Sequence, residues 1–284
     1  MRQVFYLELT VNAFQDKIKH MKLLVGLVAG LVLLNFTGLS QQESSEKPRY
    51  KTGYSAIMRL SRDIYNALPQ KYKDMINPEP VFLETDVTPF VRLIEYPDEP
   101  KPMRAVFISV GFIDLVNNIA HAKAIDKIKK GYFEKYVLSL SQETGEKELK
   151  ELPDLNNPKY WSEDILNSQL SYFNQMVGQV IAIKLAHHYL GQYKKYESKL
   201  KTPDGKYIPI NNLLTESEWQ AAVEHGSKNA LDCGLGIDGI KALYDCFDKM
   251  PKRPDWAAYF IPDFVKVKNL KKDLERIEKR FFSE

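Results

Sequence analysis

The chain has 284 residues, of which 44% are hydrophobic and 27% are charged, so its composition excludes an intrinsically disordered protein. The formal net charge is only +3, and lysine and arginine are interleaved with acidic residues, which excludes the basic surface of a nucleic-acid-binding protein. We therefore expect a folded protein of one large or two small domains, with no nucleic-acid partner.

The N-terminal residues 1–40 are predicted to be a signal peptide. Leu23–Leu34 is an uncharged apolar run, shorter than the roughly 20 residues of a membrane-spanning helix and typical of a signal-peptide core. Gly38 and Ser40 supply the small residues that a signal peptidase needs, which predicts cleavage after Ser40. Because residues 1–20 would be an unusual extension before such a signal, we expect translation to begin at Met21.

This signal predicts a secreted or periplasmic protein. After cleavage the mature chain would have no stable membrane span, and the alternative is an uncleaved membrane anchor. Residues 41–52 are polar and are predicted to be a flexible lead-in. A single α+β domain is expected over residues 53–284.

The first half of this domain mixes helices and strands. Apolar residues at helical spacing predict a helix over Gly53–Leu68, and a second short helix over Gln70–Ile76 is expected to end at Asn77-Pro78. Val81–Leu83 and Phe90–Tyr96 have the composition of strands. The strongest predicted strand is Arg104–Val110, closed by Gly111 and followed by a helical pattern that carries His121. Residues 139–159 are polar and contain glycine and proline, which predicts a loop.

A long helix is predicted over Leu170–Tyr196, with Ser162 as the N-cap of its helical segment. It carries two adjacent histidines, His187 and His188. At 100° per residue, His187 lies in line with Phe173, Met176, Val180 and Ile183, and His188 lies in line with Val177, Ile181 and Lys184. Both histidines are therefore expected to point toward the protein interior.

The C-terminal part is predicted to be helical. Thr215–Glu218 has the pattern of a capping box that begins one helix, Gly234 is expected to end it, and Asp238 is expected to cap the next. The last helix has an apolar stripe formed by Phe264, Val267, Leu270, Leu274, Ile277 and Phe281. Because its basic residues alternate with acidic ones, we expect this helix to dock on the domain rather than on a membrane surface.

The two cysteines of the chain, Cys233 and Cys246, are predicted to be free thiols. The helix expected between them would hold the sulfur atoms too far apart for a disulfide. Together these patterns predict a predominantly helical α+β fold with a small β element.

The histidines allow two interpretations. A zinc site needs at least three neutral imidazoles or carboxylates that converge on one point, and His121 with Glu224 or His225 could complete such a set with His187 or His188. The alternative is that His187 and His188 are core histidines with hydrogen bonds to the backbone or to buried polar groups. Glu224 lies away from the apolar face of its predicted helix, so the alternative to a zinc ligand at this position is a carboxylate exposed to solvent.

The order of these elements resembles the catalytic core of gluzincin metallopeptidases of the HtpX and CAAX-prenyl-protease type. VFISVGFIDLVNNIA is similar to the strand and helix before the family's HExxH motif, and VEHGSKNALDCGLGIDGIKALYDCF is similar to its glutamate helix. The resemblance covers roughly Met103–Met250 and implies a zincin-like helical core. In that family, HExxH supplies two zinc ligands and a general base, and the downstream glutamate supplies the third ligand.

The chain departs from that motif in either possible placement. If the HExxH motif is aligned with IKLAH, residues 183–187, His187 keeps the second ligand position. Ile183 then replaces the first histidine, and Lys184 replaces the general base. On HYLGQ, His188 is the first ligand, but Tyr189 takes the base position and Gln192 replaces the second histidine. Neither placement retains the glutamate that accepts a proton from the zinc-bound water.

These patterns lead to three functional hypotheses. The first is an exported zincin-like protein that has lost peptidase chemistry and acts as a binding or envelope-associated protein, with a protein or peptide as its partner. The second is an active metal-dependent hydrolase that holds Zn²⁺ with an unorthodox set formed by His121, His187, His188 and Glu224. The third is a structural envelope protein whose histidines only pack.

Overall fold

The computed structural model describes residues 53–96, 103–141 and 149–283. The predicted signal peptide 1–40 and lead-in 41–52 lie outside these residues. The first two helices are α2, Gly53–Ala67, and α3, Gln70–Lys73. The helix α2 matches its prediction, whereas α3 is shorter than the predicted Gln70–Ile76.

A three-stranded sheet follows, formed by β1 (Ile76–Glu84), β2 (Val91–Tyr96) and β3 (Met103–Ser109). The central strand β3 pairs in parallel with β1 and antiparallel with β2. The sequence Asn77-Pro78, predicted to end a helix, belongs to β1 instead. An edge strand tolerates Pro78 because one side of its backbone needs no hydrogen bonds, and the pairing with β3 is irregular between Ile76 and Val81.

Helix α4, Val110–Ile125, begins directly at the end of β3. The Ser109 side chain accepts a hydrogen bond from the backbone N–H of Phe112 at 2.9 Å, so it caps the helix. Gly111, predicted to close the strand, lies in the first turn of α4. A Cβ atom there would lie 2.0 Å from the carbonyl oxygen of Val87, so glycine allows the loop after β1 to approach.

Helix α5, Tyr132–Leu140, follows Gly131 and was not predicted. Its apolar residues Phe133, Tyr136, Val137 and Leu140 have helical spacing and are buried. The predicted loop over 139–159 therefore begins after α5, and its described part contains the 3₁₀ helix η1, Pro158–Trp161.

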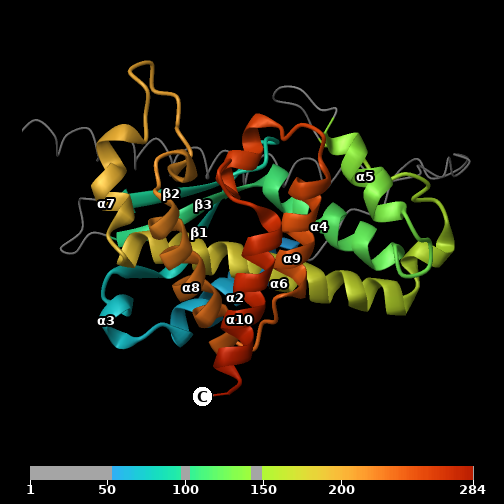
Figure 1. Cartoon of the computed structure of the whole chain (residues 1–284), viewed down its shortest axis with the longest axis horizontal. Coiled ribbons are helices and arrows are strands. Elements are labelled where there is room, and N and C mark those ends of the chain that lie inside the picture. The colour runs from blue at the N-terminus through green and yellow to red at the C-terminus, as the bar shows by residue number, and fades with distance from the viewer. Residues whose placement is uncertain (1–52, 97–102, 142–148, 284) are drawn as a thin grey trace, which may run out of the picture. The chain divides into compact units, whose positions relative to one another are not determined.

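The longest helix is α6, Glu163–Tyr189, shown in yellow in Figure 1. It packs against α2, α4, α8 and α9 and against all three strands. Ser162 is its N-cap residue, as predicted, although the Ser162 side chain makes no capping hydrogen bond. The prediction of one helix through Tyr196 is wrong, because Gly191 adopts a positive φ of 76° and a separate helix α7, Gln192–Tyr196, follows.

Three helices complete the described chain: α8 (Glu216–Asp232), α9 (Asp238–Lys249) and α10 (Val267–Phe281). Between α7 and α10 lie the 3₁₀ helices η2 (Glu197–Lys199), η3 (Ile210–Asn212) and η4 (Asp255–Tyr259). The predicted capping box at the start of α8 is confirmed, and Gly234 ends that helix with a φ of 76°. Asp238 is the first residue of α9 rather than its cap.

The C-terminal helix α10 docks on α8 and α9 (Figure 1), as predicted. Its buried residues are Val267, Leu270, Leu274 and Ile277, whereas Phe264 lies before the helix and is exposed.

These elements together form a predominantly helical α+β fold, which confirms the predicted class. Cys233 and Cys246 are free thiols. Within the described residues, no helix combines the length and the apolar character needed to cross a membrane.

Helices α6 and α8 approach each other closely at Gly226. A Cβ atom at this position would lie 2.5 Å from the Cα atom of Ile183 and 2.6 Å from its backbone nitrogen. The absence of a side chain at Gly226 therefore lets the two backbones touch.

Replacing Gly226 by alanine is expected to lower the free energy of unfolding by about 1–3 kcal/mol, because the two helices must move apart. Urea unfolding at neutral pH measures this change. Gly236→Ala is the control, because the nearest atom to its added Cβ would be 3.5 Å away. Equal losses of stability in the two variants would contradict the close contact of α6 with α8.

Candidate functional site

The last turns of α6 carry three polar side chains that are almost fully buried. Lys184, His187 and His188 have exposed fractions of 3%, 0% and 1%. Since every residue of α6 from Met176 to Tyr189 is buried, each polar atom of these side chains needs a partner inside the protein.

His188 faces the sheet. Its Nε2 lies 2.9 Å from the carbonyl oxygen of Ala105 in β3, so Nε2–H donates the hydrogen bond. Burial is the largest cause that lowers the pKa of His188, to about 3, and the ring is therefore neutral at neutral pH.

His187 faces α7 and α8. Its Nδ1 lies 2.5 Å from Oε1 of Gln192, and Nε2 of Gln192 donates to the carbonyl oxygen of Glu218 at 2.8 Å. Because Oε1 must then accept, Nδ1 of His187 carries the proton. The ring also stacks on Trp219 at 6.2 Å between ring centroids. Burial, and next the positive charge of Lys184, lower the pKa of His187 to about 3.

The other predicted zinc ligands have different surroundings. Nε2 of His121 donates to the carbonyl oxygen of Tyr160 at 2.7 Å, and burial lowers the pKa of His121. Glu224 is half exposed and pairs with Arg280 at 2.5 Å. His225, the alternative to Glu224, has its ring edge-on to Tyr189.

The structure therefore places His187 and His188 next to each other on α6, but gives each of the four predicted ligands its own partner. No three His, Cys, Asp or Glu side chains in the described ranges are grouped so that they could hold a metal ion. As placed, the four residues do not form a zinc-binding group, and the zinc site stays a prediction. The hydrogen bonds of His187 and His188 are those that the core-histidine interpretation requires.

The two possible placements of the HExxH motif differ in the structure. HYLGQ does not lie on one helix, because α6 ends at Tyr189 and Gly191 separates His188 from Gln192. IKLAH lies entirely within α6, and there the backbone of Ile183 is in contact with Gly226. Of the two placements, only IKLAH therefore lies on a single helix, with His187 at the second ligand position.

Lys184 is the most unusual group of the site. Its Nζ donates to Oδ1 of Asn211 in η3 at 3.2 Å, and desolvation lowers its pKa from 10.5 to about 7. No neighbouring carboxylate contributes to the shift. A buried amine that ionises near neutral pH is therefore held one helical turn from His187.

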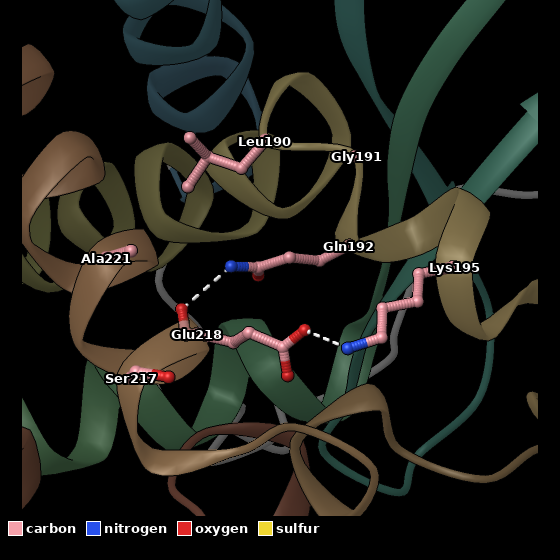
Figure 2. Close-up of a pocket in the computed structure, with 7 residues that line it drawn as sticks. All are labelled: Leu190, Gly191, Gln192, Lys195, Ser217, Glu218 and Ala221. Atoms are coloured by element: carbon pink, nitrogen blue, oxygen red, sulfur yellow. Dashed lines mark hydrogen bonds and ion pairs between the residues drawn. The ribbon is translucent and has the colours of Figure 1, made fainter.

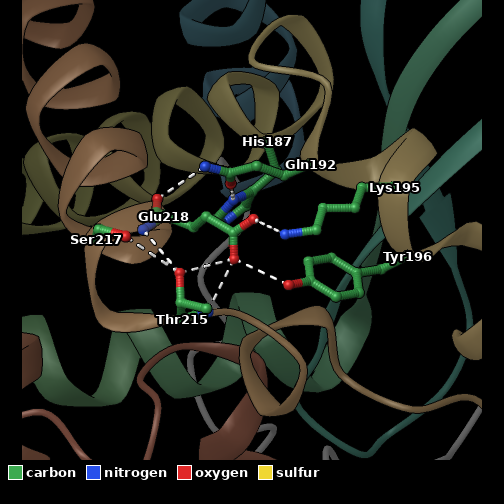
Figure 3. Close-up of polar contacts among 7 residues, drawn as sticks. All are labelled: His187, Gln192, Lys195, Tyr196, Thr215, Ser217 and Glu218. Carbon is green, nitrogen blue, oxygen red and sulfur yellow. Dashed lines mark hydrogen bonds and ion pairs between the residues drawn. The ribbon is translucent and has the colours of Figure 1, made fainter.

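A pocket of about 260 Å³ opens beside this region (Figure 2). Its lining residues come from the end of α6, from α7 and from the first turns of α8: Leu190, Gly191, Gln192, Lys195, Ser217, Glu218 and Ala221. Gln192 forms part of the wall and at the same time holds His187 (Figure 3), so the pocket adjoins the buried polar residues of α6.

The carboxylate of Glu218 organises the outer wall of this pocket. It accepts hydrogen bonds from Lys195 at 2.7 Å, from Tyr196 at 2.9 Å and from the backbone N–H of Thr215 at 2.9 Å (Figure 3). Desolvation would raise the pKa of Glu218, but these hydrogen bonds outweigh it and lower the pKa to about 2. The same side chain thus completes the capping box of α8 and joins α7 to α8.

Sequence reasoning missed the pocket and the role of Gln192. Two signals were present: the glycine at position 191, which permits the chain to turn after the histidines, and the capping box that places Glu218 at the start of α8. Their meeting in space depends on how α8 packs, which no local pattern specifies.

Comparison with known proteins finds no matching family model, no matching curated protein and no matching solved structure.

Lys184→Met is expected to stabilise the protein in a pH-dependent manner. Between pH 7 and 10.5 the folded wild type binds fewer protons at Lys184 than the unfolded chain does, so wild-type stability rises with pH in this range. The advantage of the methionine variant should therefore be largest below pH 7, on the order of a few kcal/mol, and shrink toward pH 10.5. Urea unfolding at both ends of this range measures it, and a pH-independent difference would contradict a buried, poorly ionised lysine.

Glu218→Gln is expected to remove part of the acid sensitivity of the fold. The folded-state pKa of Glu218 is lower than its ordinary value of 4.5, so its contribution to stability is complete above pH 4.5 and is lost as the pH falls toward about 2. The wild type should therefore lose more stability than the variant over this range. If the two lost stability in parallel, Glu218 would not be stabilised as a carboxylate in the folded protein.

Proposed function

We propose that the chain is an exported, zincin-like protein that has lost peptidase chemistry and acts by binding a protein or peptide partner. The proposal unites the resemblance to gluzincins with the chemistry of the residues at the motif's positions. In the IKLAH placement, the positions of the first ligand and the general base hold Ile183 and Lys184.

The observation that carries the proposal is the set of contacts made by Lys184 and His187. The amine of Lys184 is bound to Asn211, and the imidazole of His187 is bound to Gln192. A peptidase needs a carboxylate at the position of Lys184 to accept a proton from the attacking water, whereas a lysine ammonium would repel a zinc ion there.

The pocket beside Gln192 supports the binding part of the proposal. Its volume of about 260 Å³ lies below the roughly 300–1,000 Å³ of sites that enclose small molecules. Its wall offers donors and acceptors from Lys195, Ser217 and Glu218 around the apolar Leu190 and Ala221. Such a wall suits one side chain of a peptide with its neighbouring backbone.

The second candidate function is an active metal-dependent hydrolase that uses Zn²⁺. The observation in its favour is that Nε2 of His187 and Nδ1 of His188 have no hydrogen-bond partner within the described ranges. Against it, the two nitrogens belong to rings that face α7 and α8 in one case and the sheet in the other.

The loss of peptidase chemistry is tested on the full chain purified without chelator. We expect much less than one zinc per chain by elemental analysis, and no cleavage of labelled casein with or without added Zn²⁺. About one zinc per chain, with metal and cleavage both lost in His188→Ala, would instead establish the hydrolase.

The binding function is tested by selecting peptides from a random display library on the same protein. Ala221→Trp should fill the pocket and weaken the selected peptides about tenfold or more, whereas Lys135→Trp on the exposed face of α5 should leave the affinity unchanged. Equal affinities for both variants, or no selected peptide, would contradict binding at this pocket.

A further inference from the structure

The buried end of α6 holds more hydrogen-bond donors than the described residues satisfy. Nδ2 of Asn211 and Nε1 of Trp219 have no partner in the described part of the chain, although these residues are only 1% and 2% exposed. Lys184 Nζ, which can donate three hydrogen bonds, makes one, to Asn211. Among these groups, Nε2 of His187 is the one unpartnered acceptor.

These groups form one continuous strip between α6, η3 and the first turn of α8. The Lys184 amine is 3.2 Å from the amide oxygen of Asn211, so the unpartnered amide nitrogen lies beside it. His187 follows one helical turn after Lys184, close enough for the lysine charge to lower the pKa of the imidazole. The imidazole in turn stacks on the indole ring of Trp219.

Such a strip is costly for a folded protein. Each buried donor without a partner destabilises the folded state, and a buried ammonium without a counter-ion destabilises it more. Buried polar groups in native proteins are nearly always satisfied by the protein, by water or by a ligand. A cation would be repelled by the ammonium, whereas an anion with several oxygen atoms would supply both the missing charge and the missing acceptors.

The strip adjoins the pocket at Gln192. Gln192 separates it from the pocket: the Gln192 amide holds His187 on one side and lines the pocket on the other (Figures 2 and 3). Ser217 and Glu218, the two residues before Trp219 in the sequence, line the same pocket. A rotation of the Gln192 side chain would connect the pocket with the donors behind it.

We propose that Lys184, Asn211 and Trp219 form a binding site for a small oxyanion, entered from the pocket past Gln192. The ammonium of Lys184 neutralises the anion, and the amide of Asn211 and the indole of Trp219 donate to its oxygen atoms. This site goes beyond the proposed peptide-binding function and does not depend on it.

The indole N–H of Trp219 provides a direct readout. The chain has three tryptophans, Trp161, Trp219 and Trp256, so their indole signals can be followed by ¹H–¹⁵N NMR of the full chain and assigned with Trp219→Phe. Titration with sodium formate, and separately with inorganic phosphate, should give a saturable downfield shift of the Trp219 signal with at least one of the two anions. The indole signals of Trp161 and Trp256 should show no saturable shift in the same titration.

Lys184→Met should weaken this binding about tenfold or more, because the charge-assisted contact is lost. Lys194→Met, which removes an exposed lysine of α7 that does not line the pocket, should keep the dissociation constant within about twofold. The assignment is overturned if neither anion saturates, if sodium chloride gives the same shift, or if Lys184→Met binds as the wild type does. None of these variants alters Ala221, so the result is independent of the peptide-binding test.

Discussion

The complete burial of the last turns of α6 is the constraint on which the rest of this structure depends. The helix is covered by the sheet on one side and by α8 on another, and Gly226 brings the α8 backbone into contact with Ile183. Polar side chains at this place cannot be solvated by bulk water, so their protonation states and hydrogen bonds are set by neighbouring elements.

This constraint explains why two adjacent histidines have different environments. Neighbouring residues on a helix point about 100° apart, so His188 reaches the β3 backbone while His187 reaches Gln192. The hydrogen bonds fix opposite protonated nitrogens on the two rings. The structure thus gives the two imidazoles separate hydrogen-bond partners, and it leaves Lys184 as a buried amine whose hydrogen-bond partner is the amide of Asn211.

The sequence was sufficient to predict elements that depend on local chemistry. Capping by Thr215 and Glu218, the stop at Gly234 and the docking stripe of α10 follow from short-range patterns, and the structure contains all three. The end of α6 before Gly191 was missed because apolar residues continue at helical spacing on both sides of this glycine. The paired edge strand through Pro78 was missed because pairing with β3 is a long-range property.

The candidate site was only partly predictable for the same reason. The sequence indicated that His187 and His188 are buried, but the partners Gln192, Asn211 and Trp219 come from three other elements. Their convergence depends on the packing of α7, η3 and α8 around α6. Lys184 was recognised as a departure from the HExxH motif, whereas its burial without a carboxylate partner required the structure.

The central claim is that His187 is anchored as a neutral imidazole by Gln192. The most direct measurement is ¹⁵N NMR of the His187 ring between pH 5 and 8, with and without Zn²⁺, assigned with His187→Gln. The account predicts a ring protonated at Nδ1 only, unchanged across this pH range and unchanged by zinc, in agreement with its pKa of about 3. A zinc-dependent shift of the Nε2 signal at about one equivalent of metal would contradict it.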